Sequence, residues 1–320
     1  MFTIRRNIIL PFLAILTFMA TLSSFLFSEI SYTISFVTFL YLVFIPGFLV
    51  TSILRLRDLS IWDVILYSVG FSLFILMVPG VLFNWVWSLF SASPPLQTGL
   101  LATFFGVINI ALVVIASFRC RDMEWSISLD WRDYVGKWYF VVPPILTVMS
   151  VFSAIVLNNE GSNIFAIVSL CGMAVTALIS IVLHKKISEQ FFPWLLYFFS
   201  LSLLLSISLR SKFVSGWDIQ SEFVLFQLTK SLSIWRPQNM LDAYNACLSI
   251  SLLPTIFSRL TSFPDDYIYK FLYQILFAIT PVAIYQIYRK YTTHIIGFIA
   301  IIYIISQPLF IQPMTALMRQ

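Results

Sequence analysis

Two carboxylates in the last third of the chain are the residues best suited to acid–base chemistry. Asp218 and Glu222 stand four positions apart, directly after Gly216 and Trp217. Side chains at this spacing share one face of a helix. One carboxylate of such a pair can take a proton from a hydroxyl nucleophile, while the other holds a partner group or a divalent cation. We therefore assign both as candidate catalytic residues and leave the use of a metal ion open.

Arginines of the same region predict a site for a phosphate group. A guanidinium fork matches the oxygens of a monophosphate or a diphosphate. Arg210 and Arg236 flank the carboxylate pair, and Arg319 lies near the end of the chain. We assign these arginines to the binding of a substrate phosphate.

Several of these residues also have a structural interpretation. Ser215 and Asp218 fit a variant of the capping box, because a carboxylate is favoured at the N-terminus of a helix. Glu222 fits a solvated position on a helix, and Arg210 fits an anchor at the end of a membrane span. The sequence leaves the chemical and the structural interpretations open.

The composition describes a membrane protein. Hydrophobic residues make up 60% of the 320 residues and charged residues only 10%, whereas soluble domains have about 25% charged residues. So few charges cannot cover a surface exposed to water, which excludes an ordinary soluble enzyme and a disordered chain. The apolar runs are continuous rather than alternating, so the expected fold class is all-α, a polytopic bundle of membrane helices, and not an outer-membrane barrel.

Nine apolar runs predict nine membrane spans. They lie at about 7–27, 31–54, 61–90, 96–118, 138–157, 163–183, 191–209, 267–288 and 295–313. Most can cross a hydrocarbon layer of ~30 Å at a rise of ~1.5 Å per residue. Residues 244–261 are also apolar, but a crossing there would place Arg289 and Lys290 outside. We therefore interpret this stretch as a re-entrant or surface helix pair broken at Pro254.

Lysines and arginines assign the two sides of the membrane. The connections at 28–30, 91–95 and 158–162 contain none. The alternate segments contain ten, which are Arg5, Arg6, Arg55, Arg57, Arg119, Arg121, Arg132, Lys137, Lys185 and Lys186. Basic loops stay in the cytoplasm, so we expect a cytoplasmic N-terminus, an external segment at 210–266 and an external C-terminus. The net charge of +5 follows from these loops, which favours membrane lipids over nucleic acid as partners.

Cysteines and histidines do not suggest a metal centre. Cys120, Cys171 and Cys247 have no CxxC spacing, and His184 and His294 have no ligand partners nearby in the sequence. We assign no metal ligands among them.

Three stretches resemble a family of uncharacterised archaeal multi-pass membrane proteins. They are 216–223, with the sequence GWDIQSEF; 245–258, which contains LPTI; and 314–320, with the sequence MTALMRQ. That family is similar in design to the C-type glycosyltransferase superfamily, whose members include protein mannosyltransferases, oligosaccharyltransferases and aminoarabinose transferases. The resemblance covers about 190–320, and the earlier spans carry no motif of this kind.

The resemblance implies a reaction on the outer membrane face. Enzymes of the superfamily move a sugar from a polyprenyl-phosphate carrier to an acceptor hydroxyl or amide, and an acidic residue of the first large external loop acts as the base. By position, Asp218 would be this base, and Arg319 would contact the carrier phosphate with help from Arg236. Glu222 would orient the acceptor or bind a metal ion. Relatives carry His where Gln220 stands, so no role for an imidazole is expected here.

The resemblance also divides the chain. Residues 1–190 would form a six-span membrane module, and residues 191–320 would begin a glycosyltransferase-like module with the loop 210–266 and the last two spans. The superfamily core continues through further spans, so we expect a truncated reading frame or one part of a split protein. Such a chain would act in the cell membrane with a second membrane chain or a missing C-terminal half.

Two other function classes stay open. A transporter or flippase for lipid-linked sugars would use the same external cations but needs ionisable residues at mid-membrane. The first seven spans have almost none there, and Asp63 lies near one end of its span. A non-catalytic scaffold subunit, packed against a catalytic partner, is the third class.

Overall fold

The computed structural model describes residues 32–56, 59–120, 137–239 and 243–316. Within these ranges every regular element is a helix, and none is a strand. The predicted all-α fold class is therefore confirmed. The first predicted span, at 7–27, lies outside the described residues.

The chain forms two compact units, each built from two stretches that are distant in the sequence. Among the described residues, unit 1 combines those of 32–120 with those of 221–268, and unit 2 combines 137–220 with 269–316.

Long helices make up the first part of unit 1. They are α2 (Tyr32–Ile53), α3 (Ile61–Phe90) and α4 (Thr98–Arg119). Helix α2 packs against α3 and α4. At Gly47 of α2, an added Cβ atom would lie 1.8 Å from the carbonyl oxygen of Ser68 in α3, and the Gly47 amide donates to Ser72 Oγ at 2.8 Å. Glycine thus lets the two backbones touch, which is a common way to pack helices in membranes.

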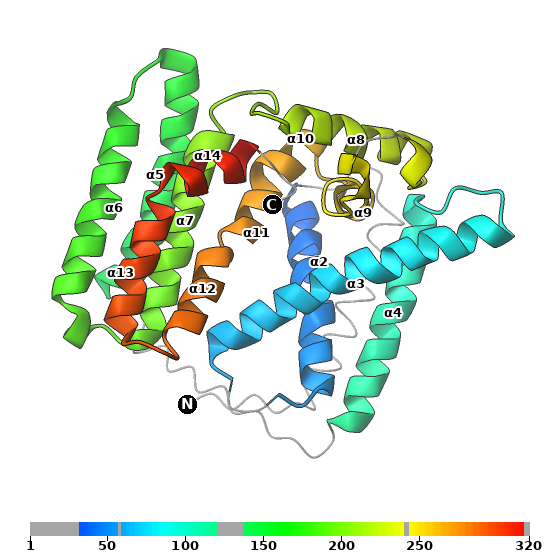
Figure 1. The fold of residues 1–320 in the computed structure, drawn as a ribbon, viewed down its shortest axis with the longest axis horizontal. Coiled ribbons are helices and arrows are strands. Elements are labelled where there is room, and N and C mark those ends of the chain that lie inside the picture. Colours follow the sequence, from blue (N-terminus) through cyan, green and yellow to red (C-terminus); the bar gives the residue numbers. More distant parts are fainter. Residues whose placement is uncertain (1–31, 57–58, 121–136, 240–242, 317–320) are drawn as a thin grey trace. The chain divides into compact units, whose positions relative to one another are not determined.

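Short helices make up the later part of unit 1. They are α8 (Ile219–Leu232), η4 (Pro237–Asn239), η5 (Ala243–Ala246), α9 (Leu252–Thr261) and α10 (Asp265–Tyr267). Helix α8 lies across the ends of α2 and α4 rather than alongside them (Figure 1). Helix α9 packs against α2, α3 and α4, and nine of its ten residues are buried. Helix α9 therefore forms part of the core of unit 1.

The predicted break at Pro254 is wrong. Pro254 is the third residue of α9, which continues without interruption to Thr261. The first amide groups of a helix have no intrahelical acceptor, so a proline there removes no hydrogen bond. Helix α9 has ten residues, which is too short for a membrane crossing. The stretch 244–261 is therefore not a span, as predicted, but it contains one α-helix instead of a broken pair.

Hydrogen bonds connect neighbouring segments at each end of the long helices of unit 1. Arg119 Nε donates to the Ile53 carbonyl at 2.8 Å, and Arg55 Nε donates to the Arg119 carbonyl at 3.0 Å. These bonds join two segments that were both predicted to be cytoplasmic. At the other end, the Leu96 amide donates to the Ser233 carbonyl at 2.8 Å. Leu96 is the first residue of a predicted span, and Ser233 lies in the segment predicted to be external.

Unit 2 contains the remaining helices. They are α5 (Trp138–Glu160), α6 (Ile164–Val182), η2 (His184–Lys186), η3 (Glu189–Phe191), α7 (Phe192–Ser208), the π-helical segment η6 (Ile268–Leu272), α11 (Tyr273–Phe277), α12 (Thr280–Tyr288), α13 (His294–Ile305) and α14 (Pro308–Ala316). Helix α7 packs against α5, α11, α12, α13 and α14. Hydroxyl pairs strengthen the packing of α5, with Thr147 and Ser202 2.8 Å apart across α5 and α7, and Ser150 and Ser169 2.8 Å apart across α5 and α6. Such hydrogen bonds are usual between membrane helices.

The described residues contain seven helical segments that are long and apolar enough to cross a membrane. They are Tyr32–Ile53, Ile61–Phe90, Thr98–Arg119, Trp138–Glu160, Ile164–Val182, Glu189–Ser208 and Asp265–Tyr288. Helices α13 and α14 add an eighth if they count as one span, although they are bent by 57° relative to each other. These segments correspond to the second to ninth predicted runs, and they identify a multi-pass membrane protein.

Candidate functional site

The two predicted catalytic carboxylates lie in different environments. Asp218 is half-buried and stands directly before the first residue of α8. Glu222 lies in the first turn of α8 and is completely enclosed, with an exposed fraction of 0%. Both residues have interactions with other groups. The interpretation of Glu222 as a solvated residue is therefore wrong, and its enclosure makes Asp218 the better candidate for contact with an acceptor.

The turn that carries Asp218 is packed tightly against helix α14. At Gly216, an added Cβ atom would lie 2.8 Å from the Cα atom of Ala316 and 2.9 Å from Cγ2 of Ile219. Only a glycine fits between these groups without displacing the backbone of α14. The structure thus brings Gly216, at the start of the stretch 216–223, against Ala316 of the stretch 314–320, although the two residues are one hundred positions apart in the sequence.

Lys270 holds the beginning of the same loop, and the sequence analysis missed it. The Lys270 side chain is only 6% exposed. Its Nζ atom donates to the carbonyl oxygens of Ser211 and Lys212, just beyond the end of α7, and Ser208 Oγ donates to the Lys270 carbonyl at 2.8 Å. An ammonium group is favoured at the C-terminus of a helix. The available signal was a single lysine in the apolar run 267–288, because charges inside membrane spans are rare and have a specific partner.

Two of the three predicted phosphate-binding arginines lie in the described residues, and they belong to different segments. Arg210 is exposed, and its Nε atom donates to the Ser206 carbonyl in the last turn of α7 at 2.8 Å, which fits the interpretation as an anchor at a helix end. Arg236 is exposed. Arg319 lies outside the described residues.

The backbone around Arg236 is held by two asparagines. The Asn84 amide group of α3 donates to the Trp235 carbonyl at 2.7 Å, and Asn84 Oδ1 accepts from the Trp235 amide at 2.9 Å. Asn245 Nδ2 donates to the Arg236 carbonyl at 2.8 Å, while its own carbonyl accepts from Trp235 Nε1 at 3.1 Å. Asn245, the first residue of the second stretch in the resemblance, therefore fixes the backbone that carries an exposed arginine.

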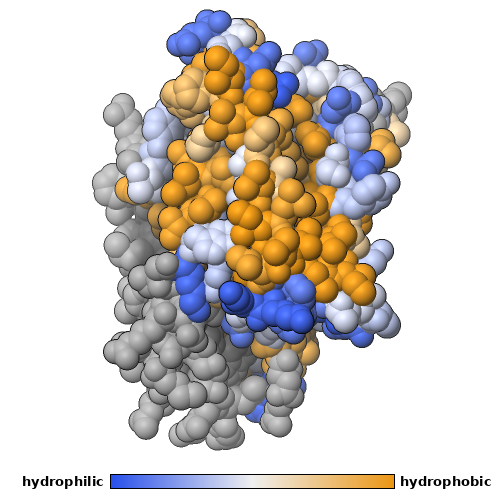
Figure 2. Space-filling model, turned by 90° about the vertical axis from the view of Figure 1, so that its left-hand side faces the viewer, coloured by the Kyte–Doolittle hydropathy of each residue, from blue (hydrophilic) through white to orange (hydrophobic). Residues whose placement is uncertain are grey.

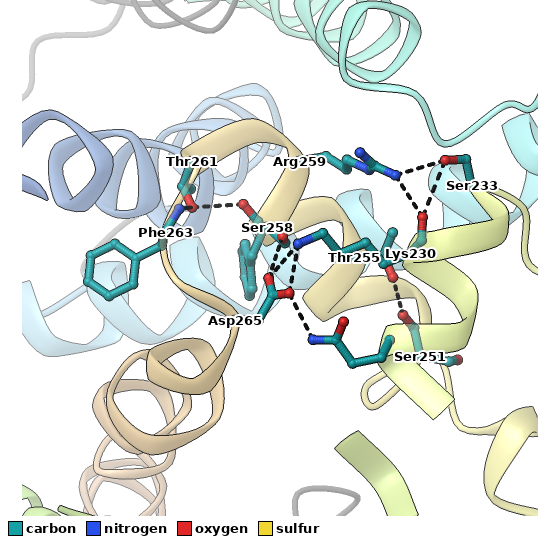
Figure 3. A network of polar contacts seen from close by, with 11 residues as sticks. Lys230, Ser233, Ser251, Thr255, Ser258, Arg259, Thr261, Phe263 and Asp265 are labelled. Carbon is teal, nitrogen blue, oxygen red and sulfur yellow. Dashed lines mark hydrogen bonds and ion pairs between the residues drawn. The ribbon is translucent and has the colours of Figure 1, made fainter. Parts of the chain in front are cut away.

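A polar network ties α8 to α9 and α10, and it is centred on Asp265 (Figure 3). Lys230 Nζ lies 2.8 and 2.7 Å from the two carboxylate oxygens of Asp265. Gln227 Nε2 donates to the same carboxylate at 2.8 Å, and Ser258 Oγ donates to it at 2.7 Å. Asp265 is the first residue of α10. The network of Gln227, Lys230, Ser258 and Asp265 is called the α8–α10 network below.

Arg259 extends this network to the end of α8. Its Nη2 atom donates to the Lys230 carbonyl at 2.6 Å and to Ser233 Oγ at 2.8 Å. Arg259 and Lys230 therefore stabilise the packing of α8 over α9. Neither cation is assigned to a substrate, although both lie in the segment predicted to be external.

Neither a metal site in the described residues nor a related protein indicates which reaction this chain would catalyse. Within the described ranges, no group of three or more His, Cys, Asp or Glu side chains could hold a metal ion. No family model, no curated protein and no solved structure matches this chain.

Proposed function

We propose that this chain belongs to a membrane glycosyltransferase that takes a sugar from a polyprenyl-phosphate carrier, with Asp218 as the base. The observation that carries the proposal is the contact between Gly216 and Ala316. This contact joins the turn that bears the half-buried Asp218 to the helix that leads to Arg319. A base and a phosphate ligand must lie near one another for such a transfer.

The proposed reaction is an inverting displacement. Asp218 accepts the proton of an acceptor hydroxyl, and the acceptor oxygen forms a bond to the anomeric carbon of the sugar. The bond between that carbon and the phosphate oxygen breaks, and the polyprenyl phosphate leaves with the electron pair. Lys270 keeps the backbone at Ser211 and Lys212 in place, so the loop that carries the base is ordered at its start.

Arginines would stabilise the charge on the leaving phosphate. Arg319 follows Ala316 by three positions in the sequence, and Ala316 is the residue packed against Gly216. Arg236 is exposed at a backbone position that Asn245 fixes. Arg210 uses its Nε atom on the Ser206 carbonyl, which leaves its terminal NH₂ groups for a phosphate.

The positions of the charged residues argue against ion-coupled transport, the alternative function. A coupled transporter needs ionisable residues near the middle of its spans. In the described spans, Asp63 caps the N-terminus of α3 through Ser60, and Lys270 binds carbonyl groups at the end of α7. Both charged side chains therefore form hydrogen bonds at the ends of helices.

The proposal is tested with labelled carriers in membranes of the native cells. Undecaprenyl phosphate that carries tritiated mannose or tritiated glucose is the donor, and transfer is measured as label that leaves the lipid-soluble fraction. We expect Asp218→Asn to lower transfer by roughly a hundred-fold or more, because the amide keeps the shape but accepts no proton. A flippase would move the carrier between leaflets and leave the label lipid-soluble.

The matched control is Asp266→Asn, since Asp266 is also a half-buried carboxylate at the start of a helix. We expect this variant to retain transfer. Full transfer by Asp218→Asn would refute the assignment of the base. Wild-type membranes with no more transfer than membranes that lack the chain would refute the proposed function itself.

A further inference from the structure

One end of unit 2 gathers cations that the proposed reaction does not use. We call this end the basic rim, and it consists of Lys137, Lys185, Lys186, Arg289 and Lys290. Three chain connections contribute to it, and contacts between their neighbours place them at the same end. His294 Nδ1 lies 3.0 Å from Glu189 Oε1, and the rings of His184 and His294 have centroids 6.1 Å apart.

The start of α5 reaches the same end. The rings of Tyr139 and Phe191 have centroids 4.7 Å apart. Trp194 Nε1 donates to the Phe140 carbonyl at 3.2 Å. Lys137, which directly precedes α5, is therefore at the same end as the connection between α6 and α7.

The basic rim has a large excess of positive charge. In the described part of this end, Glu189 is the one carboxylate among five cations, and it is engaged by His294. At the opposite end of unit 2, the exposed or half-buried charges balance, with Glu160 and Asp218 against Arg210 and Lys212. The excess therefore belongs to one end of the unit and is not a general property of its surface.

Apolar and aromatic side chains border the basic rim. Tyr288 and Tyr291 are 42% and 84% exposed, and tyrosine favours the headgroup level of a bilayer. Val182 at the end of α6 is 76% exposed, and Ile296 near the start of α13 is 54% exposed. Helices α6 and α13 pack against each other. Figure 2 shows the resulting surface, a broad hydrophobic area with hydrophilic residues along its lower edge.

We infer that the basic rim binds the headgroup of an anionic phospholipid such as phosphatidylglycerol. The lysine ammonium groups face the phosphate, and the acyl chains lie along the apolar surface of α6 and α13. A soluble polyanion would bind the positive charges but would not contact the adjoining apolar surface. A lipid can contact both the cations and the apolar surface. Each lysine near an anionic membrane surface strengthens binding roughly five-fold.

The inference is tested with the purified full-length chain in detergent micelles. Native mass spectrometry measures the retention of dioleoyl phosphatidylglycerol and of dioleoyl phosphatidylcholine, added at equal concentration. We expect the wild-type chain to retain phosphatidylglycerol preferentially. The variant Lys185→Gln/Lys186→Gln/Lys290→Gln should weaken that retention by roughly a hundred-fold and leave phosphatidylcholine unchanged.

A matched single substitution controls for general charge. Lys290→Gln should weaken retention of phosphatidylglycerol roughly five-fold, whereas Lys212→Gln, an exposed lysine at the opposite end of unit 2, should have no effect. If the triple variant does not fold, Lys290→Gln alone still tests whether the basic rim binds phosphatidylglycerol. Equal retention of both lipids by the wild type, or equal losses in Lys290→Gln and Lys212→Gln, would overturn the inference. Binding of soluble glycerol phosphate as tight as that of phosphatidylglycerol would overturn it in favour of a soluble anion.

Discussion

The α8–α10 network and the basic rim use positive charge in opposite ways. In the network, Lys230 is paired with Asp265 and Arg259 binds the end of α8. In the basic rim, Lys185 and Lys290 are exposed. A cation inside a protein is costly unless it is paired and hydrogen-bonded, whereas a cation at the headgroup level meets water and lipid phosphate. Residues of one type therefore stabilise the fold in the α8–α10 network and are available to the membrane in the basic rim.

The largest expected effect comes from removing the centre of the α8–α10 network. Asp265→Ala leaves the Lys230 ammonium group, Ser258 and Gln227 without their shared acceptor. We expect the free energy of unfolding in detergent to fall by about 2–4 kcal/mol, somewhat less than for a fully enclosed pair, because the Lys230 side chain is 30% exposed. Asp266→Ala, one position further, is the control and should change it by about 0.5 kcal/mol or less. Equal losses in both variants would contradict a structural role for the network.

A second prediction compares two lysines that belong to unit 2. Lys270→Met removes the donor to the carbonyls of Ser211 and Lys212 and should lower the free energy of unfolding by about 1.5–3 kcal/mol. Lys212→Met removes an exposed side chain and should cost about 0.5 kcal/mol or less. Thermal unfolding in the same detergent measures both. If Lys270→Met unfolded with the same free energy as the wild type, the stabilising role of the Lys270 ammonium group would be refuted.

The third prediction concerns the packing of the Asp218 turn. Gly216→Ala forces a Cβ atom to within 2.8 Å of the Ala316 backbone and should cost about 1–2 kcal/mol through overpacking. Gly70→Ala, in α3, meets nothing within 4 Å and should be neutral or stabilising by up to about 1 kcal/mol. Sugar transfer should fall in the first variant only. A Gly216→Ala variant with full stability and full transfer would remove the main support for the proposed function.

The smallest effect on stability is expected in the basic rim. Glu189→Gln weakens its contact with His294, but the Glu189 side chain is 66% exposed, so the loss of stability should be about 0.5 kcal/mol or less. The same substitution removes the carboxylate from the rim and should raise the retention of phosphatidylglycerol. A lower retention in native mass spectrometry would show that Glu189 organises the rim instead of opposing its charge.

Helix starts show how far local sequence predicts this fold. Asp265 stands in the first turn of α10, where an acidic residue interacts favourably with the helix dipole. Its partner Lys230 stands 35 positions earlier, and nothing in the local pattern indicates the pairing. Pro254 shows the opposite case, since a proline that was expected to break a helix stands inside its first turn. The local pattern did not place the start of α9 correctly.

The candidate site was likewise predicted only in part from the local sequence. Asp218 was selected by its residue type and by its position near a helix start, and its half-buried position before α8 agrees with that. The enclosure of Glu222 and the use of Lys270 at the end of α7 were not predicted. Four positions along a helix place two carboxylates on one face, but neighbouring segments decide which of them is enclosed.

The all-helical, multi-pass character of this protein and the grouping of its basic connections were determined by the sequence alone. Both depend on hydropathy and charge summed over stretches of about twenty residues, and such sums need no knowledge of neighbouring helices. The tertiary structure decided which charges are paired inside, which glycines touch another backbone, and which cations remain at the surface. Those outcomes depend on how each helix is rotated and placed against others, and a shift of one residue turns a side chain by about 100° around the helix axis.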